Sequence, residues 1–421
     1  MKSSLPDLGP LRNGGTAVVI GGGPGGTAAA IAIKHRAQGL GRSIHVIIVE
    51  GKQFVGELHH NQCAGVLSPP IAEILENELE IPFPHHLTQR DIRGYVLHTP
   101  QRQIVLDGEA ETSAAVRRVQ FDAYMLEAAC ERGVELTQAR VTDLEFHPDR
   151  VVVYTESSQL TADVVIGAFG MDEGTASLFH RAVGYRSPPS LSSVVTKYHP
   201  SEAGLCAFGD RIHAFLPATP RIEFGAVTPK GNHLTINIAG QAADANLMDA
   251  FLSFPEVRRV LPSLEDSDQS HPNDLCYYKG RFPSGLAHNF TGDRFVMVGD
   301  AAGLVRAFKG KGVTSAIQTG IRAAQVILEG GISQDAFRAY LAANQDILED
   351  LPYGRFMRLL TITTSRFGLM NTALIAAETD PGLRQALFNA VSGASPYQPV
   401  LRSSLSPRTL WALLKALARP R

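Results

Sequence analysis

Two glycine-rich segments and the acids near them are the residues whose types and spacing point most directly to chemistry. The first, Gly21-Gly22-Gly23-Pro24-Gly25-Gly26, contains the pattern G-x-G-x-x-G, and Glu50 follows it by twenty-four residues. In this pattern Gly21 permits a tight turn, Gly23 lets the backbone approach a pyrophosphate, and Gly26 lets a helix pack closely on a strand. A carboxylate at Glu50 can accept hydrogen bonds from ribose hydroxyls. The spacing predicts a dinucleotide site.

The residues around this turn have the patterns of the elements that must hold it. Thr16–Ile20 is a short β-branched run typical of buried parallel strands, and Thr27–His35 is small and apolar at helical spacing. Ser43–Glu50 is a second apolar run that ends in the acid. This order places phosphates at a helix N-terminus, where free N–H groups and the positive end of the helix dipole stabilise negative charge. We therefore interpret the segment as a Rossmann-like nucleotide-binding unit.

The second glycine-rich segment lies far downstream and contains another acid at a predicted strand end. Phe295–Val298 is expected to be a strand that Gly299-Asp300 ends, and Gly310-Lys311-Gly312 is expected to open a helix. There Asp300 can hold a ribityl hydroxyl, and the helix start at Gly312 and Val313 can stabilise negative charge on a reduced flavin. The alternative is a strand–turn–helix unit that only closes the sheet.

The remaining patterns predict further elements. A helix is expected over Phe121–Cys130, a strand over Val134–Val141 and a hairpin over Arg150–Leu160. In that strand Val141 can offer backbone groups to an adenine ring. Period-two runs in Arg93–Leu106 and in about residues 190–284 predict an antiparallel sheet. From Gln334 the pattern is helical, with breaks expected at Pro381, Pro396, Pro399 and Pro407.

Composition narrows the classes of protein. A chain of 421 residues with 44% hydrophobic and 19% charged residues is globular and long enough for two domains. A net charge of −2 gives no electrostatic footprint for nucleic acid. The N-terminal residues lack the apolar stretch of a signal peptide, and we expect a cytoplasmic protein. Four cysteines without a C-x-x-C pair disfavour a zinc site or a disulfide framework, so no metal site is predicted.

The last residues of the chain have a composition of their own. Leu401–Arg421 contains five basic residues and no acid. After Pro407, helical spacing places five apolar residues on one face: Leu410, Trp411, Leu413, Leu414 and Leu417. This is typical of an interfacial helix, which makes peripheral membrane contact a candidate property. The alternative is a terminal helix that packs its leucines on the domain and leaves its cations in water.

Taken together, these motifs resemble flavoproteins of the para-hydroxybenzoate-hydroxylase fold and, more narrowly, the geranylgeranyl reductase family. The two glycine-rich segments carry the resemblance to the fold, and R-x-x-F-D at Arg118–Asp122 agrees with it. The cysteine-alanine-glycine segment in His60–Ser68 and P-K-G within Glu223–Gly240 match the narrower family. The resemblance covers about residues 15–330 in the right order.

The resemblance implies an α/β fold with a Rossmann-like FAD-binding domain, a mostly antiparallel β-sheet substrate domain and a helical C-terminal region. We expect the FAD-binding domain over 14–68, 108–177 and 285–330, the substrate domain over 69–107 and 178–284, and the helical region over 331–421. The FAD is expected to be non-covalent. The predicted cofactor-binding residues are Gly21, Gly23, Pro24, Gly25, Gly26, Glu50, Gly51, Cys63, Ala64, Arg118, Val141, Asp300, Gly310, Gly312 and Val313.

Cys63 is also the candidate catalytic residue. It follows His59-His60, and a neighbouring protonated histidine can lower the pKa of a thiol. The alternative is a cysteine that only packs near the isoalloxazine ring.

The sequence departs from the family at three places. Phe169 stands where members carry the acid of an Asp-Gly pair, and Ala226 and Thr228 stand where members carry aromatic residues. Lys309 and Lys311 stand where members carry a threonine and an acid in the late glycine motif. These two lysines favour an anionic reduced flavin or an acidic partner such as ferredoxin. The alternative is that they are solvated turn lysines. The electron donor thus stays open between NAD(P)H and reduced ferredoxin, which would be an electron-donor protein.

The predicted function is that of an FAD-dependent oxidoreductase in lipid metabolism, with hydride transfer to or from an apolar, prenyl-like or lipid-like substrate. A monooxygenase of the same fold and an electron-transfer flavoprotein that feeds a quinone are the alternatives. Halogenation is disfavoured, because halogenases of this fold carry a W-x-W-x-I-P element and the single tryptophan here is Trp411.

Overall fold

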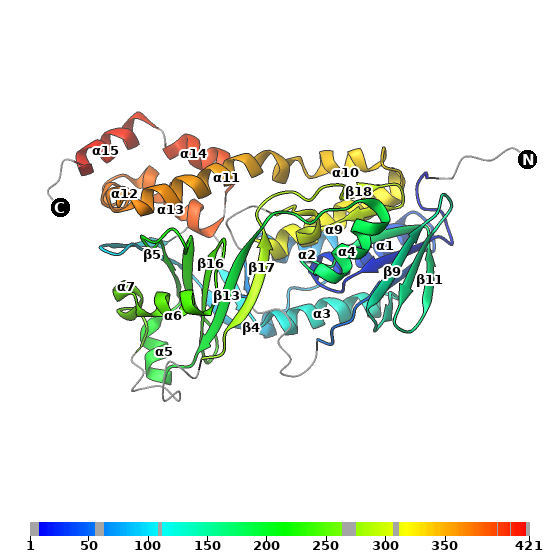
Figure 1. Ribbon diagram of the computed structural model, residues 1–421, viewed down its shortest axis with the longest axis horizontal. Coiled ribbons are helices and arrows are strands. Elements are labelled where there is room, and N and C mark those ends of the chain that lie inside the picture. Colours follow the sequence, from blue (N-terminus) through cyan, green and yellow to red (C-terminus); the bar gives the residue numbers. More distant parts are fainter. Residues whose placement is uncertain are drawn as a thin grey trace, which may run out of the picture.

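The computed structural model describes residues 8–54, 63–107, 112–262, 275–305, 311–393, 395–404 and 406–417. Over these residues the protein is a mixed α/β structure in which a parallel sheet and a mostly antiparallel sheet lie side by side (Figure 1). C-terminal helices form a further layer above the antiparallel sheet. The predicted fold class is confirmed.

The first sheet carries the glycine turn. Its strand order is β18-β19-β12-β1-β2-β8, and all neighbours are parallel except β18 and β19. The last four residues of both β1 and β2 are buried, as expected for strands covered on both faces. The bounds are β1 (Thr16–Ile20), β2 (His45–Val49), β8 (Glu135–Thr137), β12 (Val164–Gly167), β18 (Thr291–Gly292) and β19 (Phe295–Met297).

Three helices pack together against this sheet: α1 (Pro24–Gly39), α3 (Arg118–Glu131) and α9 (Gly312–Glu329). α1 and α9 approach backbone to backbone, because a Cβ atom on Gly320 would overlap with the carbonyl oxygen of Gly25. The predicted helices are confirmed, and α1 begins three residues earlier than expected, with Pro24 in its first turn. The close crossing brings the N-termini of α1 and α9 to the same cavity.

The second sheet has the strand order β17-β13-β16-β15-β14-β5-β6 and is antiparallel except for β14 and β5. Short helices α5 (Glu202–Phe208), α6 (Ala245–Ser253) and α7 (Pro255–Arg258) accompany it, and α6 and α7 share its apolar core. The strands are β5 (Gly94–His98), β6 (Gln103–Asp107), β13 (Ser190–Tyr198), β14 (Arg211–Phe215), β15 (Phe224–Pro229), β16 (Leu234–Gly240) and β17 (Tyr278–Pro283).

The C-terminal helices pack on this second sheet. Leu97 and Leu106 of the sheet share one apolar cluster with Met370, Leu374 and Phe388 of the helices. Arg358 also ties them together, because its guanidinium makes two 2.5 Å hydrogen bonds to the carboxylate of Glu223. The helices are α10 (Phe337–Ala343), α11 (Gln345–Arg366), α12 (Leu369–Ala377), α13 (Pro381–Ser392), α14 (Tyr397–Ser404) and α15 (Pro407–Leu417).

Smaller elements connect these layers. A three-stranded antiparallel sheet shares the core of the first sheet, and a second three-stranded sheet, β3-β7-β4, contains the strand that precedes Arg118. The remaining bounds are β3 (Val66–Leu67), β4 (Thr88–Ile92), β7 (Ser113–Val116), β9 (Val141–Phe146), β10 (Val151–Thr155), β11 (Gln159–Ala162), α2 (Ile71–Glu78), α4 (Glu173–Val183), α8 (Gly299–Ala302) and the 3-10 helix η1 (His85–Leu87).

Three local predictions differ from the structure. The strand expected over Val134–Val141 is divided between β8 and β9 of different sheets, because Gln138 sits in a turn and donates its amide to the carbonyl of Glu50. The strand does end just before Gly299-Asp300, but the short helix α8 that begins there was not predicted; Asp300 lies in its first turn, after Gly299 takes a positive φ of 57°. Pro399 does not break a helix; it lies within α14, near its start.

Candidate active site

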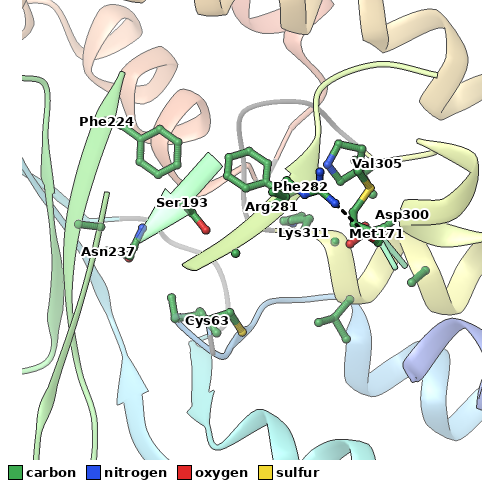
Figure 2. Close-up of a pocket in the computed structure, with 18 of the residues that line it drawn as sticks. Cys63, Met171, Ser193, Phe224, Asn237, Arg281, Phe282, Asp300, Val305 and Lys311 are labelled. Carbon is green, nitrogen blue, oxygen red and sulfur yellow. Dashed lines mark hydrogen bonds between the residues drawn. The ribbon is translucent and has the colours of Figure 1, made fainter. Parts of the chain in front are cut away.

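One cavity of about 1610 Å³ extends from the glycine turn of the first sheet to the C-terminal helices. Pockets for a single small ligand are usually about 300–1,000 Å³, so this cavity has room for a dinucleotide and a second molecule. Figure 2 shows Ser193, Phe224 and Asn237 on one side of the space and Asp300 and Lys311 on the other, with Cys63 near its floor.

The glycine turn forms one end of this cavity. Gly21 has a φ of 112°, which side chains rarely tolerate, and a Cβ on Gly26 would overlap with the carbonyl oxygen of Gly21. These findings confirm that Gly21 permits the tight turn and that Gly26 permits close packing of the helix on the strand. Gly23 lines the cavity, and no atom lies within 4 Å of the point where its Cβ would be. This open cradle, at the N-terminus of the sixteen-residue α1, fits a pyrophosphate.

Glu50 braces the turn as well as facing the cavity. Its Oε2 accepts a hydrogen bond of 2.8 Å from the N–H of Gly22, and its Oε1 accepts one of 2.8 Å from the N–H of Lys52. Gly51 and Val141 also line this end, as does Arg140, which the sequence analysis did not single out. The carboxylate is thus held at the strand end where the predicted ribose contact would form; that contact stays a prediction.

Arg118 and Cys63 meet near the middle of the cavity. The guanidinium of Arg118 pairs with the buried carboxylate of Asp122 one helical turn later, at 3.0 Å, and lies 3.8 Å from the sulfur of Cys63. Burial alone would lower the pKa of Arg118, but Asp122 and Cys63 outweigh it and raise the pKa above its ordinary value. The guanidinium is therefore a fixed positive charge beside the thiol.

Asp300 and the start of α9 form the opposite wall. Burial raises the pKa of Asp300, and the nearby charge of Arg118 opposes that shift. A Cβ on Gly312 would lie 3.7 Å from Oδ1 of Asp300, so the start of α9 is in direct contact with the carboxylate. Lys311 lines the cavity and donates a hydrogen bond of 3.0 Å from Nζ to the carbonyl of Pro69, so it is not simply a solvated turn lysine.

Lys230 lies behind the cavity wall and supports it, a role that sequence reasoning missed. Its side chain is 4% exposed, and its Nζ donates a hydrogen bond of 3.0 Å to the carbonyl of Val116, two residues before Arg118. Burial lowers its pKa to about 8, although the neighbouring Cys63 acts in the opposite direction. The P-K-G segment contained this residue, but nothing in it indicated that the lysine lies behind the cysteine segment.

The far end of the cavity is apolar. Part of it is the face of the second sheet, where Ala226 lies in register with Ala214 and with Asn237. The rest belongs to the C-terminal helices, whose contribution the sequence analysis also missed. The lining residues from α11 to α15 include Phe356, Met357, Leu360, Leu369, Met370, Ala373, Leu383, Leu387, Val391, Leu401, Leu413 and Leu417.

The structure brings nearly all predicted site residues to this one cavity. Gly26 does not line it and serves the packing of α1, and Gly310, Lys309, His59 and His60 lie outside the described residues. Those on the wall are Gly21, Gly23, Pro24, Gly25, Glu50, Gly51, Cys63, Ala64, Arg118, Val141, Asp300, Gly312 and Val313. The open cradle at Gly23 and the two helix N-termini fit an FAD; the role of each residue stays a prediction.

Two further features bear on ligands. In the described part of the chain, no three His, Cys, Asp or Glu side chains are grouped so that they could hold a metal ion. No helix within the described ranges is long and apolar enough to cross a bilayer.

Comparison with known proteins identifies relatives of the whole chain. No protein-family model matches the chain. The digeranylgeranylglycerophospholipid reductase 2 of Methanosphaera stadtmanae is 25% identical over 346 residues, which cover 78% of this chain and 82% of the relative. The chloroplastic geranylgeranyl diphosphate reductase of Nicotiana tabacum is 23% identical over an alignment of 444 residues, which covers 95% of this chain and 86% of the relative.

Solved structures of low sequence identity share the fold. The flavin-dependent brominase Bmp2 superposes with a TM-score of 0.67 at 17% identity, covering 93% of this chain and 98% of its own. A geranylgeranyl bacteriochlorophyll reductase-like protein of Thermoplasma acidophilum gives 0.60 at 20% identity, with 97% and 96% covered. A variant of halogenase PltM in complex with FAD gives 0.64 at 13% identity, with 97% and 93% covered. The motifs, the fold and these comparisons agree, and the chain is an FAD-dependent oxidoreductase related to the geranylgeranyl reductase family.

Proposed function

We propose that this protein is a reductase of an apolar, prenyl-like lipid. The observation that carries the proposal is that one continuous cavity joins the dinucleotide cradle at Gly23 to an apolar chamber, the end of the cavity between the second sheet and the helices α11 to α15. The names of the two curated relatives, both reductases of geranylgeranyl compounds, support the same substrate class. Ala226 and Ala214 leave space on the floor of this chamber where bulkier residues would narrow it.

In this proposal the FAD is held without a covalent bond. Gly23 and the N-terminus of α1 receive its pyrophosphate, Glu50 its ribose, and Asp300 its ribityl chain. The helix start at Gly312 and Val313 would stabilise the negative charge that the flavin gains on reduction. When bound, FAD supplies the hydride chemistry. The segments 14–68, 108–177 and 285–330 form its domain.

Cys63 is the proposed catalytic residue. Its sulfur lies 3.8 Å from the guanidinium of Arg118, and the residue lines the cavity between the two ends. A proton held at its sulfur can pass to the substrate carbon that neighbours the one receiving hydride. Arg118 acts as a positioning residue, because its guanidinium orients the thiol and is itself fixed by Asp122.

The proposal also includes an electron donor for the flavin and a peripheral contact with a membrane. Reduction needs a two-electron supply from NAD(P)H or from reduced ferredoxin, and Lys311 on the cavity wall is compatible with an acidic donor protein. α15 provides peripheral membrane contact through its exposed Trp411 and Leu414.

Anaerobic stopped-flow absorbance tests the reaction class. The yellow holoprotein is first reduced in parallel by NADH, NADPH and reduced ferredoxin, and the reduced form is then mixed with detergent-solubilised geranylgeraniol. We expect the oxidised absorbance to return without oxygen. Reoxidation by oxygen alone would favour the monooxygenase, and reoxidation by a quinone alone would favour the electron-transfer flavoprotein. Either result would overturn the proposal.

A further inference from the structure

The cavity has an opening whose rim is formed by exposed apolar side chains. Four residues both line the cavity and remain 40–56% exposed: Phe356, Leu360, Leu369 and Leu417. They belong to α11, α12 and α15, which are neighbours in space because α12 packs against both of the others, although α13 and α14 separate α12 from α15 in the sequence. Apolar side chains that are exposed at a cavity mouth mark a route for an apolar ligand.

The same surface continues beyond the rim. Of the ten large hydrophobic residues that are exposed in the described part of the chain, eight lie between residues 356 and 417. The four outside the rim are Leu359, Phe367, Trp411 and Leu414, which are 58–65% exposed. In α15 the predicted apolar face is therefore split, because Leu413 lines the cavity while Trp411 and Leu414 point outward. We call these eight residues the apolar rim surface.

Charge distinguishes this region from the rest of the chain. Residues 351–421 contain nine Lys and Arg residues and two acidic residues, whereas the whole chain has a net charge of −2. Arg366, Arg402, Arg408 and Lys415 are exposed on the elements that carry the apolar rim surface or on the adjoining α14. Lys415 lies over the ring of Trp411, 5.3 Å from its centre. Apolar side chains surrounded by cations are complementary to an anionic lipid surface.

The opposite end of the cavity does not share these features. It is lined by charged groups such as Glu50, Lys52 and Arg140, which suit the nucleotide and repel an apolar chain. An apolar lipid that entered from this end would have to pass the FAD.

We propose that α11, α12 and α15 form a doorway that docks on an anionic bilayer and admits the lipid substrate directly from it. This inference rests on the proposed function and adds the route and the partner: a phospholipid surface that carries negative charge. The lipid tail then moves from bilayer to cavity without exposing its methylene groups to water, which is unfavourable for apolar surface.

The single tryptophan makes the doorway testable without turnover. Trp411 lies on α15, and its emission can be transferred to retinol, an isoprenoid alcohol that absorbs in the right range. The holoprotein is mixed with retinol in vesicles of phosphatidylcholine with phosphatidylglycerol, in vesicles of phosphatidylcholine alone, and in detergent micelles. We expect a blue shift of Trp411 emission with the anionic vesicles, and retinol-dependent quenching that is faster there than with neutral vesicles.

A doorway variant and a matched control separate the route from general effects. Ala373→Phe/Leu413→Phe adds bulk to two lining residues, whereas Leu40→Phe adds the same ring at an exposed leucine that belongs neither to the cavity wall nor to the apolar rim surface. Retinol uptake from anionic vesicles should slow on the order of tenfold in the double variant and stay within about twofold in the control. Flavin content and circular dichroism establish that both variants are folded.

Each of three other results would contradict a specific part of the proposal. Equal uptake by the double variant and the wild type would show that the lipid enters elsewhere. Equal rates from anionic and neutral vesicles would overturn the anionic surface as the partner. If the wild type takes up no retinol even from micelles, the apolar substrate class fails, and the doorway fails with it.

Discussion

The guanidinium of Arg118 lies 3.8 Å from the sulfur of Cys63, and the same guanidinium is anchored at 3.0 Å by the buried Asp122. The thiol therefore faces the cavity from a position fixed by an ion pair within α3, the helix that follows the strand β7. The sequence alone left this cysteine between catalysis and packing, and the arrangement makes the catalytic role that we propose for it testable.

Cys63→Ala should reduce anaerobic turnover by roughly 10²–10⁴-fold, the usual contribution of a positioned proton donor. Its flavin content and melting temperature should stay near those of the wild type, because the thiol is not the residue that anchors Arg118. Cys206→Ala, at an exposed cysteine away from the cavity, is the control and should keep full activity. Unchanged turnover in Cys63→Ala would return the residue to a packing role.

Gly23→Val should abolish FAD binding, so that the protein purifies colourless. The valine side chain would fill the open cradle at the N-terminus of α1, where the pyrophosphate is expected. Gly39→Val, at the other end of the same helix and also without neighbours within 4 Å of the added Cβ, should remain yellow. Full flavin absorbance in Gly23→Val, measured after gel filtration, would refute the phosphate assignment.

Lys230 makes stability depend on pH in the alkaline range. Its pKa is about 8 in the folded protein and 10.5 ordinarily, so between these values the unfolded chain binds more protons. Stability should therefore rise with pH between about 8 and 10.5, by up to about 1.4 kcal/mol per pH unit. Urea unfolding of wild type and Lys230→Met should show this slope in the wild type alone.

Lys279→Met, at an exposed lysine, is the control for that slope and should behave as the wild type does. The same rise in stability with pH in Lys230→Met would mean that other groups cause it.

Asn237 of β16 places a polar group on the sheet face that lines the apolar chamber. Its Oδ1 is buried and has no hydrogen-bond partner among the described residues, while Val195 and Ala226 flank it in register. We expect it to accept a hydrogen bond from a hydroxyl of the substrate, a contribution of about 1 kcal/mol. Geranylgeraniol should then bind several-fold more tightly than the hydrocarbon squalene, and Asn237→Leu should remove the difference. A preference that survives in Asn237→Leu would place the polar contact elsewhere.

Local patterns were sufficient to predict the nucleotide-binding half of the site. The turn at Gly21, the close packing at Gly26 and the placement of Glu50 after β2 all depend on residues within one strand–helix–strand unit. Contacts across long stretches of chain could not be predicted in this way. Lys230 and Val116, which form a hydrogen bond, are 114 residues apart in the sequence. The C-terminal helices that cover the apolar end of the cavity have an apolar pattern, which predicts that they pack on something but does not identify the sheet on which they pack.

The boundary between β8 and β9 was predicted wrongly, because a side-chain hydrogen bond and not strand propensity determines where β8 ends. Val134–Val141 has the composition of one strand, yet Gln138 leaves the ladder to donate to the carbonyls of Glu50 and Lys52. That turn redirects the chain so that Val141 begins a strand of another sheet and lines the nucleotide end of the cavity.

Mass spectrometry of the product shows whether a flavin and an apolar isoprenoid react within one cavity. The holoprotein, kept under nitrogen with the donor that reduces it, is incubated with geranylgeraniol and extracted. We expect a product that has gained pairs of hydrogen atoms and no oxygen, and far less of it from Cys63→Ala. Unchanged geranylgeraniol under nitrogen, with an oxygenated product once air is admitted, would show that the protein is a monooxygenase and not a reductase.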